Sequence, residues 1–240
     1  MRKLITFWMV LLLHTFLAPE IKAQHNTLTL QEAAEGWVIL FDGITTEGWR
    51  GFKMEGMPEG WKVENGCLTT FAGEGEETRG DIITVNKYED FELYLEWAIS
   101  PGGNSGIFFH VVEGDYSSAY ATGPEYQLID DAGYPDKLEE WQQTGANYAM
   151  HPADKTKKKL MPAGEFNSSR IRVEKGHVTH WLNDEIVVEY DLWTDEWHKL
   201  AHEGKWKDYP DYGLARSGHI GLQDHGSIVK FRNIKLKVLD

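Results

Sequence analysis

Hydrophobic and polar residues alternate with period two in many short segments of this chain, which is the pattern of half-buried β-strands. Turn-forming residues separate these segments, as at 64–66, 174–177 and 183–184. One short helix is expected over 29–35. The expected strands are 37–41, 61–64, 67–71, 91–99, 105–112, 126–129, 170–174, 178–182 and 186–190. The pattern therefore predicts an all-β protein with long loops.

The C-terminal segment 218–236 combines strand alternation with polar side chains that bind ligands or transfer protons. In an extended strand alternate side chains share a face, so Ile220 and Leu222 are expected to point into the core. Three polar side chains are then expected on the opposite face: His219, Gln223 and His225. This segment is where the sequence favours a site.

The same segment is expected to continue as a strand pair. After a turn at 226–227 an apolar strand resumes, and its alternation slips at 231–233, which predicts a bulge. Two long loops, 131–162 and 193–217, interrupt the strand pattern elsewhere. Loops of this length in a compact domain are usually functional or mobile, so these two are candidates for the walls of a groove.

The N-terminus has the layout of a signal peptide. Arg2 and Lys3 precede an apolar run over 4–17, and the segment that ends at Ala23 before Gln24 predicts cleavage after Ala23. The apolar run is shorter than the about 20 residues that span a bilayer, so a membrane anchor is disfavoured. We therefore expect a periplasmic or secreted protein with one domain over 24–240.

The net charge limits the classes of binding partner, and the cysteine content limits disulfide formation. The formal net charge of −14 disfavours nucleic acids and anionic membranes as partners. The chain has one cysteine, Cys67, so it forms no internal disulfide, and we expect the thiol to be a small buried group in a strand. The sequence does not indicate an oligomeric state.

Several blocks along the chain together resemble one family, the 3-keto-disaccharide hydrolase domains. The blocks lie at 36–43 with 48–49, 80–81, 90–93 with 96–97, 103–109, 125–130, 180–183 and 218–236. The resemblance implies a concanavalin A-like jelly roll, a β-sandwich of two antiparallel sheets. It also implies activity on glycosides that are oxidised at C3, so the expected partner is a small carbohydrate.

The segment 125–130 supplies a candidate catalytic acid. Glu125 and Gln127 share a face of the expected strand. The segment is similar to the catalytic strand of laminarinase-like glucanases, but Gln127 stands where those enzymes carry the middle acid. Glycosidases of that type need two carboxyl groups, so ordinary glucanase chemistry is disfavoured. A surface acid that caps a loop is the alternative for Glu125.

A 3-keto sugar allows a different route, because the ketone acidifies the hydrogen at C2. A base removes that proton, the C1 oxygen leaves by elimination, and water can then add back. His225 is the candidate base, because imidazole titrates near neutrality, and Glu125 could exchange roles with it. His110 is a candidate second imidazole on the same face. Each histidine could instead be structural.

Further polar residues are candidates for sugar binding, although turn formation or packing would also explain them. They are Asp81, Asn104, Ser105, His110, Gln127, Tyr148 and Gln223.

No cofactor is indicated with certainty, and a divalent metal that stabilises the enolate is an open alternative. Residues of ligand type are Glu125, His110, His225 and Asp224, without a short metal motif. His198 and His202 have the i, i+4 spacing of a helical ligand pair, but a loop or a short surface helix is the favoured interpretation.

The favoured function is hydrolysis of 3-keto-glycosides, by displacement or by elimination followed by hydration. A noncatalytic carbohydrate-binding module of the same fold and a laminarinase-like glucanase are the alternatives.

Overall fold

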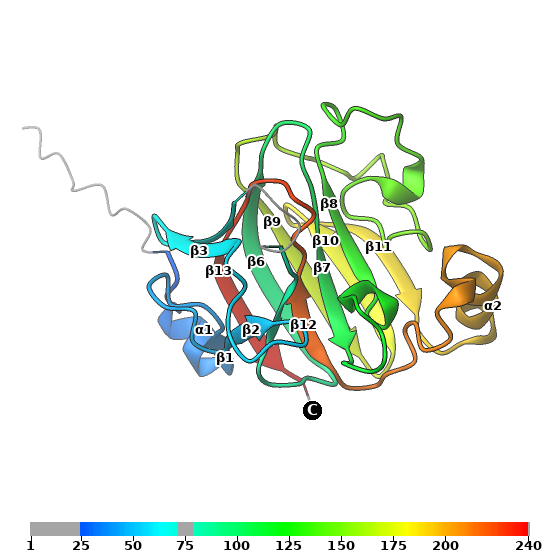
Figure 1. Cartoon of the computed structure of the whole chain (residues 1–240), viewed down its shortest axis with the longest axis horizontal. Coiled ribbons are helices and arrows are strands. Elements are labelled where there is room, and N and C mark those ends of the chain that lie inside the picture. The colour runs from blue at the N-terminus through cyan, green and yellow to red at the C-terminus, as the bar shows by residue number, and fades with distance from the viewer. Residues whose placement is uncertain (1–24, 72–78, 240) are drawn as a thin grey trace, which may run out of the picture.

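Two antiparallel sheets pack face to face in the computed structural model, which describes residues 25–71 and 79–239 (Figure 1). The large sheet has the strand order β11-β10-β9-β6-β13-β4-β3, and β1 also pairs with β13. Its strands are β1 (Trp37–Ile39), β3 (Trp61–Glu64), β4 (Cys67–Thr70), β6 (Phe91–Ile99), β9 (Asn167–Glu174), β10 (His177–Leu182), β11 (Glu185–Asp191) and β13 (Val229–Val238).

The small sheet has the order β2-β5-β12-β7-β8. Its strands are β2 (Trp49–Gly51), β5 (Ile82–Thr84), β7 (Asn104–Val111), β8 (Glu125–Ile129) and β12 (His219–Leu222). The predicted β-sandwich of two antiparallel sheets is confirmed. The predicted signal peptide, residues 1–23, lies outside the described residues.

The main core lies between the sheets. The large sheet contributes fully buried residues such as Leu95 and Trp97, and the small sheet contributes Ile107, Ile220 and Leu222. Because the side chains of a strand alternate, the neighbours of these small-sheet residues point to the outer face of the small sheet. That outer face therefore carries the remaining side chains of β5, β7, β8 and β12.

The helices are short and lie in the connections. The predicted helix is confirmed as α1 (Leu30–Ala34), and Thr29 and Glu32 form a capping box at its N-terminus. The other helices are η2 (Ala119–Ala121), η3 (Glu140–Gln142), α2 (Asp195–Glu203) and η4 (Lys205–Asp208). None of the helices in the part of the chain described here has the length and apolar character of a membrane span.

The expected strands are observed with small differences at their ends. Strand β7 begins at Asn104 and β8 begins at Glu125, one residue earlier than expected in each case. Strands β2 and β5 were not expected, because three residues are too few for an alternating pattern. Cys67 is buried in β4, as predicted.

The prediction that the two strands of the C-terminal segment pair with each other is wrong. Strand β12 lies in the small sheet and β13 lies in the large sheet, so the turn between them carries the chain from one sheet to the other (Figure 1). The physical reason is that both strands bury apolar residues in the same core from opposite sides, for example Leu222 and Phe231. The predicted bulge in β13 is confirmed, with Asn233 at a φ of 52° and a register shift against β6.

Aromatic rings hold the loop 193–217 against the sandwich. Five rings stack in parallel planes, with interplanar angles of 7–9° between neighbours. We call this stack the aromatic column, and in order it contains His151, Tyr190, Trp197, Tyr212 and Trp206. Helix α2 supplies Trp197 and η4 supplies Trp206, so the column ties both helices to β11.

Candidate active site

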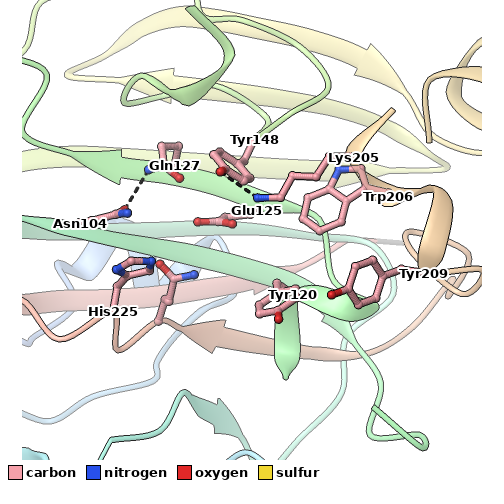
Figure 2. A pocket seen from close by; sticks show the side chains of 10 residues that line it. Asn104, Tyr120, Glu125, Gln127, Tyr148, Lys205, Trp206, Tyr209 and His225 are labelled. Atoms are coloured by element: carbon pink, nitrogen blue, oxygen red, sulfur yellow. Dashed lines mark hydrogen bonds between the residues drawn. The ribbon is translucent and has the colours of Figure 1, made fainter. Parts of the chain in front are cut away.

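A cavity of about 300 Å³ lies over the outer face of the small sheet (Figure 2). At one end it is lined by amides and an imidazole, which we call the polar half: Asn104, Gln127, Gln223 and His225. At the other end it is lined by rings and one cation, which we call the aromatic half: Tyr120, Tyr148, Lys205, Trp206 and Tyr209. Glu125 lies between the two halves (Figure 2).

Strand register brings the polar residues together. Gly106 of β7 is opposite Gln127 of β8, and Phe108 is opposite Glu125. On the other side of β7, the main-chain N–H of Gln223 donates to the carbonyl of Gly106. Directly paired residues share a face of the sheet, so these side chains meet on the outer face although about a hundred residues separate them along the chain.

Gly106 makes room for the carboxyl group of Glu125. A Cβ atom at position 106 would overlap the Oε1 atom of Glu125. The side chain of Glu125 therefore lies across the bare backbone of Gly106. The glycine serves close approach here, because its φ is not in the left-handed region.

Glu125 is a buried acid that lines the cavity. The residue is 4% exposed, and no hydrogen bond from the described residues reaches its carboxyl group. Burial raises the pKa of Glu125 to about 8, against an opposing effect of Lys205 and with a smaller contribution from Asp81. At neutral pH the carboxyl group is protonated and can donate a proton.

The amides of the polar half carry unused hydrogen-bonding capacity. The Nε2 atom of Gln127 donates to Oδ1 of Asn104 at 2.9 Å. The amide hydrogens of Asn104 take no part in this bond and can donate to a ligand. The Oε1 atom of Gln223 is buried without a partner among the described residues. A buried acceptor without a donor is costly, so this atom indicates a ligand that donates to it.

Asp81 holds the turn that carries His225. Its Oδ1 atom accepts from the main-chain N–H of Asp224 at 3.0 Å, and the Asp224 carboxylate in turn accepts from the N–H of Gly226 at 2.9 Å. Burial raises the pKa of Asp81 to about 7. Asp81 is not among the residues that line the cavity, whereas His225 lines it and is exposed. The geometry thus makes Asp81 a support for the turn.

Two connecting loops and η2 build the aromatic half. The loop 131–162 supplies Tyr148, and the Nζ atom of Lys205 donates to its Oη at 2.8 Å. The ring of Trp206 is the last of the aromatic column and stacks on Tyr212 with centroids 4.0 Å apart. Tyr209 lies edge-on to Tyr120, with centroids 5.8 Å apart.

Sequence reasoning missed four of the residues that line the aromatic half, namely Tyr120, Lys205, Trp206 and Tyr209. Loop residues have no periodicity that fixes where their side chains point. The available signal was the density of aromatic residues in 193–217.

The structure does not bring His110 to the cavity. His110 has a φ of 52°, and the pairing between β7 and β12 shifts register next to it. Its Nε2 atom bonds to the carbonyl oxygen of Glu89 at 2.7 Å, and its ring stacks on Trp193. Burial lowers the pKa of His110. The alternation that was expected to carry it to the face of Phe108 is interrupted by this bulge.

Ser105 and His219 also lie away from the cavity lining. Ser105 is completely buried, and its hydroxyl donates to the main-chain oxygen of Gln223 at 2.8 Å. The Nδ1 atom of His219 bonds to the carbonyl oxygen of Thr84 at 2.7 Å, at the far end of β12. Both residues support the strand that carries Gln223.

The ligand-type residues do not gather into a metal cluster. Within residues 25–71 and 79–239, no group of three or more His, Cys, Asp or Glu side chains has the arrangement to hold a metal ion. Glu125 and His225 line the cavity, whereas Asp224 bonds to main-chain N–H groups. His198 and His202 lie on α2 with stacked rings.

Known proteins resemble this chain over most of its length. A curated protein of Bacteroides thetaiotaomicron, named 3-keto-disaccharide hydrolase, is 39% identical over 245 residues, which cover 91% of this chain and 83% of that protein. The expectation that this chain is an enzyme agrees with that name.

Solved structures give the same picture. A crystal structure from Parabacteroides distasonis, described as a glycosyl hydrolase, has a TM-score of 0.84 at 41% identity and covers 90% of this chain and 100% of that one. A carbohydrate-binding module from Bacillus subtilis has a TM-score of 0.51 at 12% identity, covers 79% of this chain and 95% of that one, and shows the fold alone.

The family resemblance seen in the sequence is confirmed by a family model that matches residues 36–237. The chain belongs to the family of 3-keto-alpha-glucoside-1,2-lyase-like domains.

Proposed function

We propose that this protein cleaves 3-keto-glycosides by elimination across C1 and C2, followed by addition of water. The observation that carries the proposal is the position of Glu125, a protonated carboxyl group between an imidazole-bearing polar half and an aromatic half. The reaction needs a base, a donor to the enolate oxygen and an acid for the leaving group. The cavity lining contains a candidate for each.

In the first half of the reaction His225 takes the proton from C2 of the sugar. The electron pair moves onto the C3 oxygen. The Asn104 amide accepts from Gln127 through its oxygen, so its two hydrogens, which bond to none of the described residues, can donate to the enolate. The enolate then re-forms the carbonyl group, a double bond forms between C1 and C2, and the bond from C1 to the glycosidic oxygen breaks. Glu125 gives its proton to the departing oxygen.

In the second half the proton transfers run backward. Water attacks C1 of the unsaturated ketone, and the carboxylate of Glu125 accepts the proton of that water. The protonated imidazole of His225 returns a proton to C2. Both residues regain their starting state, and the products are a 3-keto sugar and the free alcohol. Because His225 is exposed, its proton exchanges with solvent between the two steps.

A direct glycosidase mechanism fits the lining less well. Of the ten residues that line the cavity in the described part of the chain, Glu125 alone carries a carboxyl group. Retaining and inverting glycosidases each use two carboxyl groups on either side of the bond. The ketone route needs only one, because the acidity of C2 replaces the second.

The family and the relative support the substrate class. The family is described as 3-keto-alpha-glucoside-1,2-lyase-like, and the Bacteroides relative carries the name 3-keto-disaccharide hydrolase. The cavity volume of about 300 Å³ is at the small end of ligand pockets, which favours a small glycoside over a polysaccharide.

The test compares a 3-keto-glucoside with its unoxidised parent in deuterated water. We expect cleavage of the 3-keto form, little cleavage of the parent, and solvent deuterium at C2 of the released 3-keto sugar by NMR. A substrate deuterated at C2 should react more slowly if proton removal limits the rate. Equal cleavage of both glycosides without deuterium at C2 would indicate direct displacement. Binding without cleavage would indicate a carbohydrate-binding module.

A further inference from the structure

The order of the groups along the cavity matches the order of the reacting atoms along the sugar. In a 3-keto sugar the carbon that loses its proton, C2, lies between the carbonyl carbon C3 and the carbon that releases the leaving group, C1. The polar half carries the amides and His225, and Glu125 separates it from the aromatic half (Figure 2). A leaving group protonated by Glu125 therefore extends away from the amides and into the aromatic half.

We propose that the aromatic half is the subsite for the leaving group and that it selects leaving groups that are rings with polar substituents. This inference rests on the proposed function and adds the orientation of the substrate. The ring can come from a second sugar or from a substituted phenol, because both present an apolar face and polar substituents.

The side chains of the aromatic half are of the kind that binds such rings. Tyr120, Tyr148 and Tyr209 are half-buried, so part of each remains open to a ligand, whereas Trp206 is 1% exposed. Tyrosine rings stack on apolar ring faces, and their hydroxyl groups bond to polar substituents. An aliphatic leaving group such as methanol would leave this surface unused.

Lys205 adds a cation to this subsite. Its Nζ atom donates to the Oη atom of Tyr148 and lies 4.0 Å from the centroid of that ring. Lys205 is exposed, and the ammonium group has three hydrogens, so it can donate further bonds to a hydroxylated ring. The positive charge of Lys205 also opposes the rise in the pKa of Glu125. It therefore lies close to where the leaving oxygen must be.

An orphan acceptor at the other end supports this orientation. The Oε1 atom of Gln223 is buried in the polar half without a partner among the described residues, and residue 223 is 8% exposed. A sugar ring in the polar half offers hydroxyl donors to this atom, whereas the polar atoms of the aromatic half are tyrosine hydroxyls, an ammonium group and the indole N–H of Trp206, most of which donate. The 3-keto ring thus fits the polar half better than the aromatic half.

The experiment measures kcat/KM for three 3-keto-glucosides that differ only in the leaving group: methyl, 4-nitrophenyl and glucosyl. The test variant is Tyr209→Ala, because Tyr209 lines the cavity and is not part of the aromatic column. The matched control is Tyr116→Ala, because Tyr116 contacts Tyr209 with ring centroids 6.2 Å apart but does not line the cavity. Lys205→Met is a second test variant that keeps the aliphatic stem.

We expect Tyr209→Ala to lower kcat/KM about tenfold or more for ring leaving groups, since the variant removes a ring on which the leaving group stacks. The methyl substrate should change less than twofold, and the control should match the wild type on all three. A loss confined to the 4-nitrophenyl substrate assigns the subsite to phenols, and a loss confined to the glucosyl substrate assigns it to sugars. Lys205→Met should lower the rate for the same ring substrates.

An equal loss on all three substrates, or none, would overturn the subsite assignment while the proposed function stands. Failure of the wild type to cleave any of the three would instead overturn the proposed function.

Discussion

The polar half of the cavity is carried mainly by neighbouring strands of the small sheet, whereas the aromatic half is carried by η2 and two long loops. The strand-borne half is held by main-chain ladders, in which a shift of one residue would turn every side chain to the other face. The loop-borne half is held by ring stacking in the aromatic column. The positions needed for chemistry are therefore fixed by the sheet, and those that contact a variable part of the substrate are fixed by side-chain packing.

The largest effect is expected from substitutions that remove the proposed acid and base and leave the shape of the cavity largely unchanged. Glu125→Gln and His225→Ala should each lower kcat for a 3-keto-glucoside by about 10² to 10⁴, the usual contribution of a general acid or base. Glu203→Gln and His202→Ala, on the exposed end of α2, are the matched controls. Wild-type rates in the first two variants, with unchanged melting temperatures, would leave these residues a structural role.

A smaller effect is expected when the acid is displaced. Gly106→Ala introduces a methyl group where the carboxyl group of Glu125 lies, so the acid must move. Misplacement by about 1 Å can cost about 10² in rate, and we expect a loss of that order in kcat. Gly56→Ala is the control, because no heavy atom lies within 4 Å of its added Cβ. If Gly106→Ala had the kinetics of the control, Glu125 would not need its present position.

The loop-borne half can be disturbed through its packing. Gly213 has a φ of 65°, and a Cβ there would overlap the ring of Trp197 in the aromatic column. Gly213→Ala should lower the free energy of unfolding by about 2 kcal/mol. Gly164→Ala is the control, because it has a φ of 90° with no heavy atom within 4 Å of the added Cβ. Urea unfolding of both variants separates the packing cost from the backbone cost, and equal losses would exclude the ring clash as the cause.

The pH dependence is the mildest test, and it addresses the residue between the halves. Because burial raises the pKa of Glu125 to about 8, the proton donor is lost as the pH rises above that value. Below a pH of about 8 Glu125 stays protonated, so its ionisation should not change kcat/KM. Above that pH, kcat/KM should fall about tenfold per pH unit, because kcat/KM reports the ionisation of the free enzyme. A rate that rises through pH 9 would contradict the assignment of Glu125 as the acid.

The same shift gives a stability test, in which stability, like activity, falls as the pH rises. The folded state binds a proton at Glu125 up to pH of about 8, whereas an unfolded glutamate releases it near pH 4.3, so stability falls as the pH rises between these values. Glu125→Gln removes this dependence. In urea unfolding, the variant should gain on the wild type from pH 5 to pH 9 by on the order of 4 kcal/mol, about 1.4 kcal/mol for each pH unit below 8. If the difference in the free energy of unfolding between variant and wild type did not change with pH, burial would not raise the pKa of Glu125.

The difference between the halves also explains what the sequence predicts. Period two is enough to put Glu125 and Gln127 on one face, and Gln223 and His225 follow from the same rule. Periodicity does not reveal a bulge that turns a single residue, so His110 was expected on the wrong face. Lys205 and the rings around it depend on contacts between distant loops.

The sheet assignment of the C-terminal segment was missed for a related reason. The alternation in β12 and β13 tells which residues are buried but not from which sheet they enter the core. Asp81 illustrates the same limit at a single residue. It was expected to bind a sugar, and its carboxylate instead bonds to the main chain of Asp224.

The aromatic column has an optical consequence. Closely stacked aromatic rings held in fixed orientations give the near-ultraviolet circular dichroism by which fixed side-chain packing is recognised. Trp206 is both the last ring of the column and part of the cavity lining. A ligand that contacts Trp206 should change the near-ultraviolet circular dichroism. The protein therefore has an intrinsic spectroscopic reporter for occupancy of one end of the cavity.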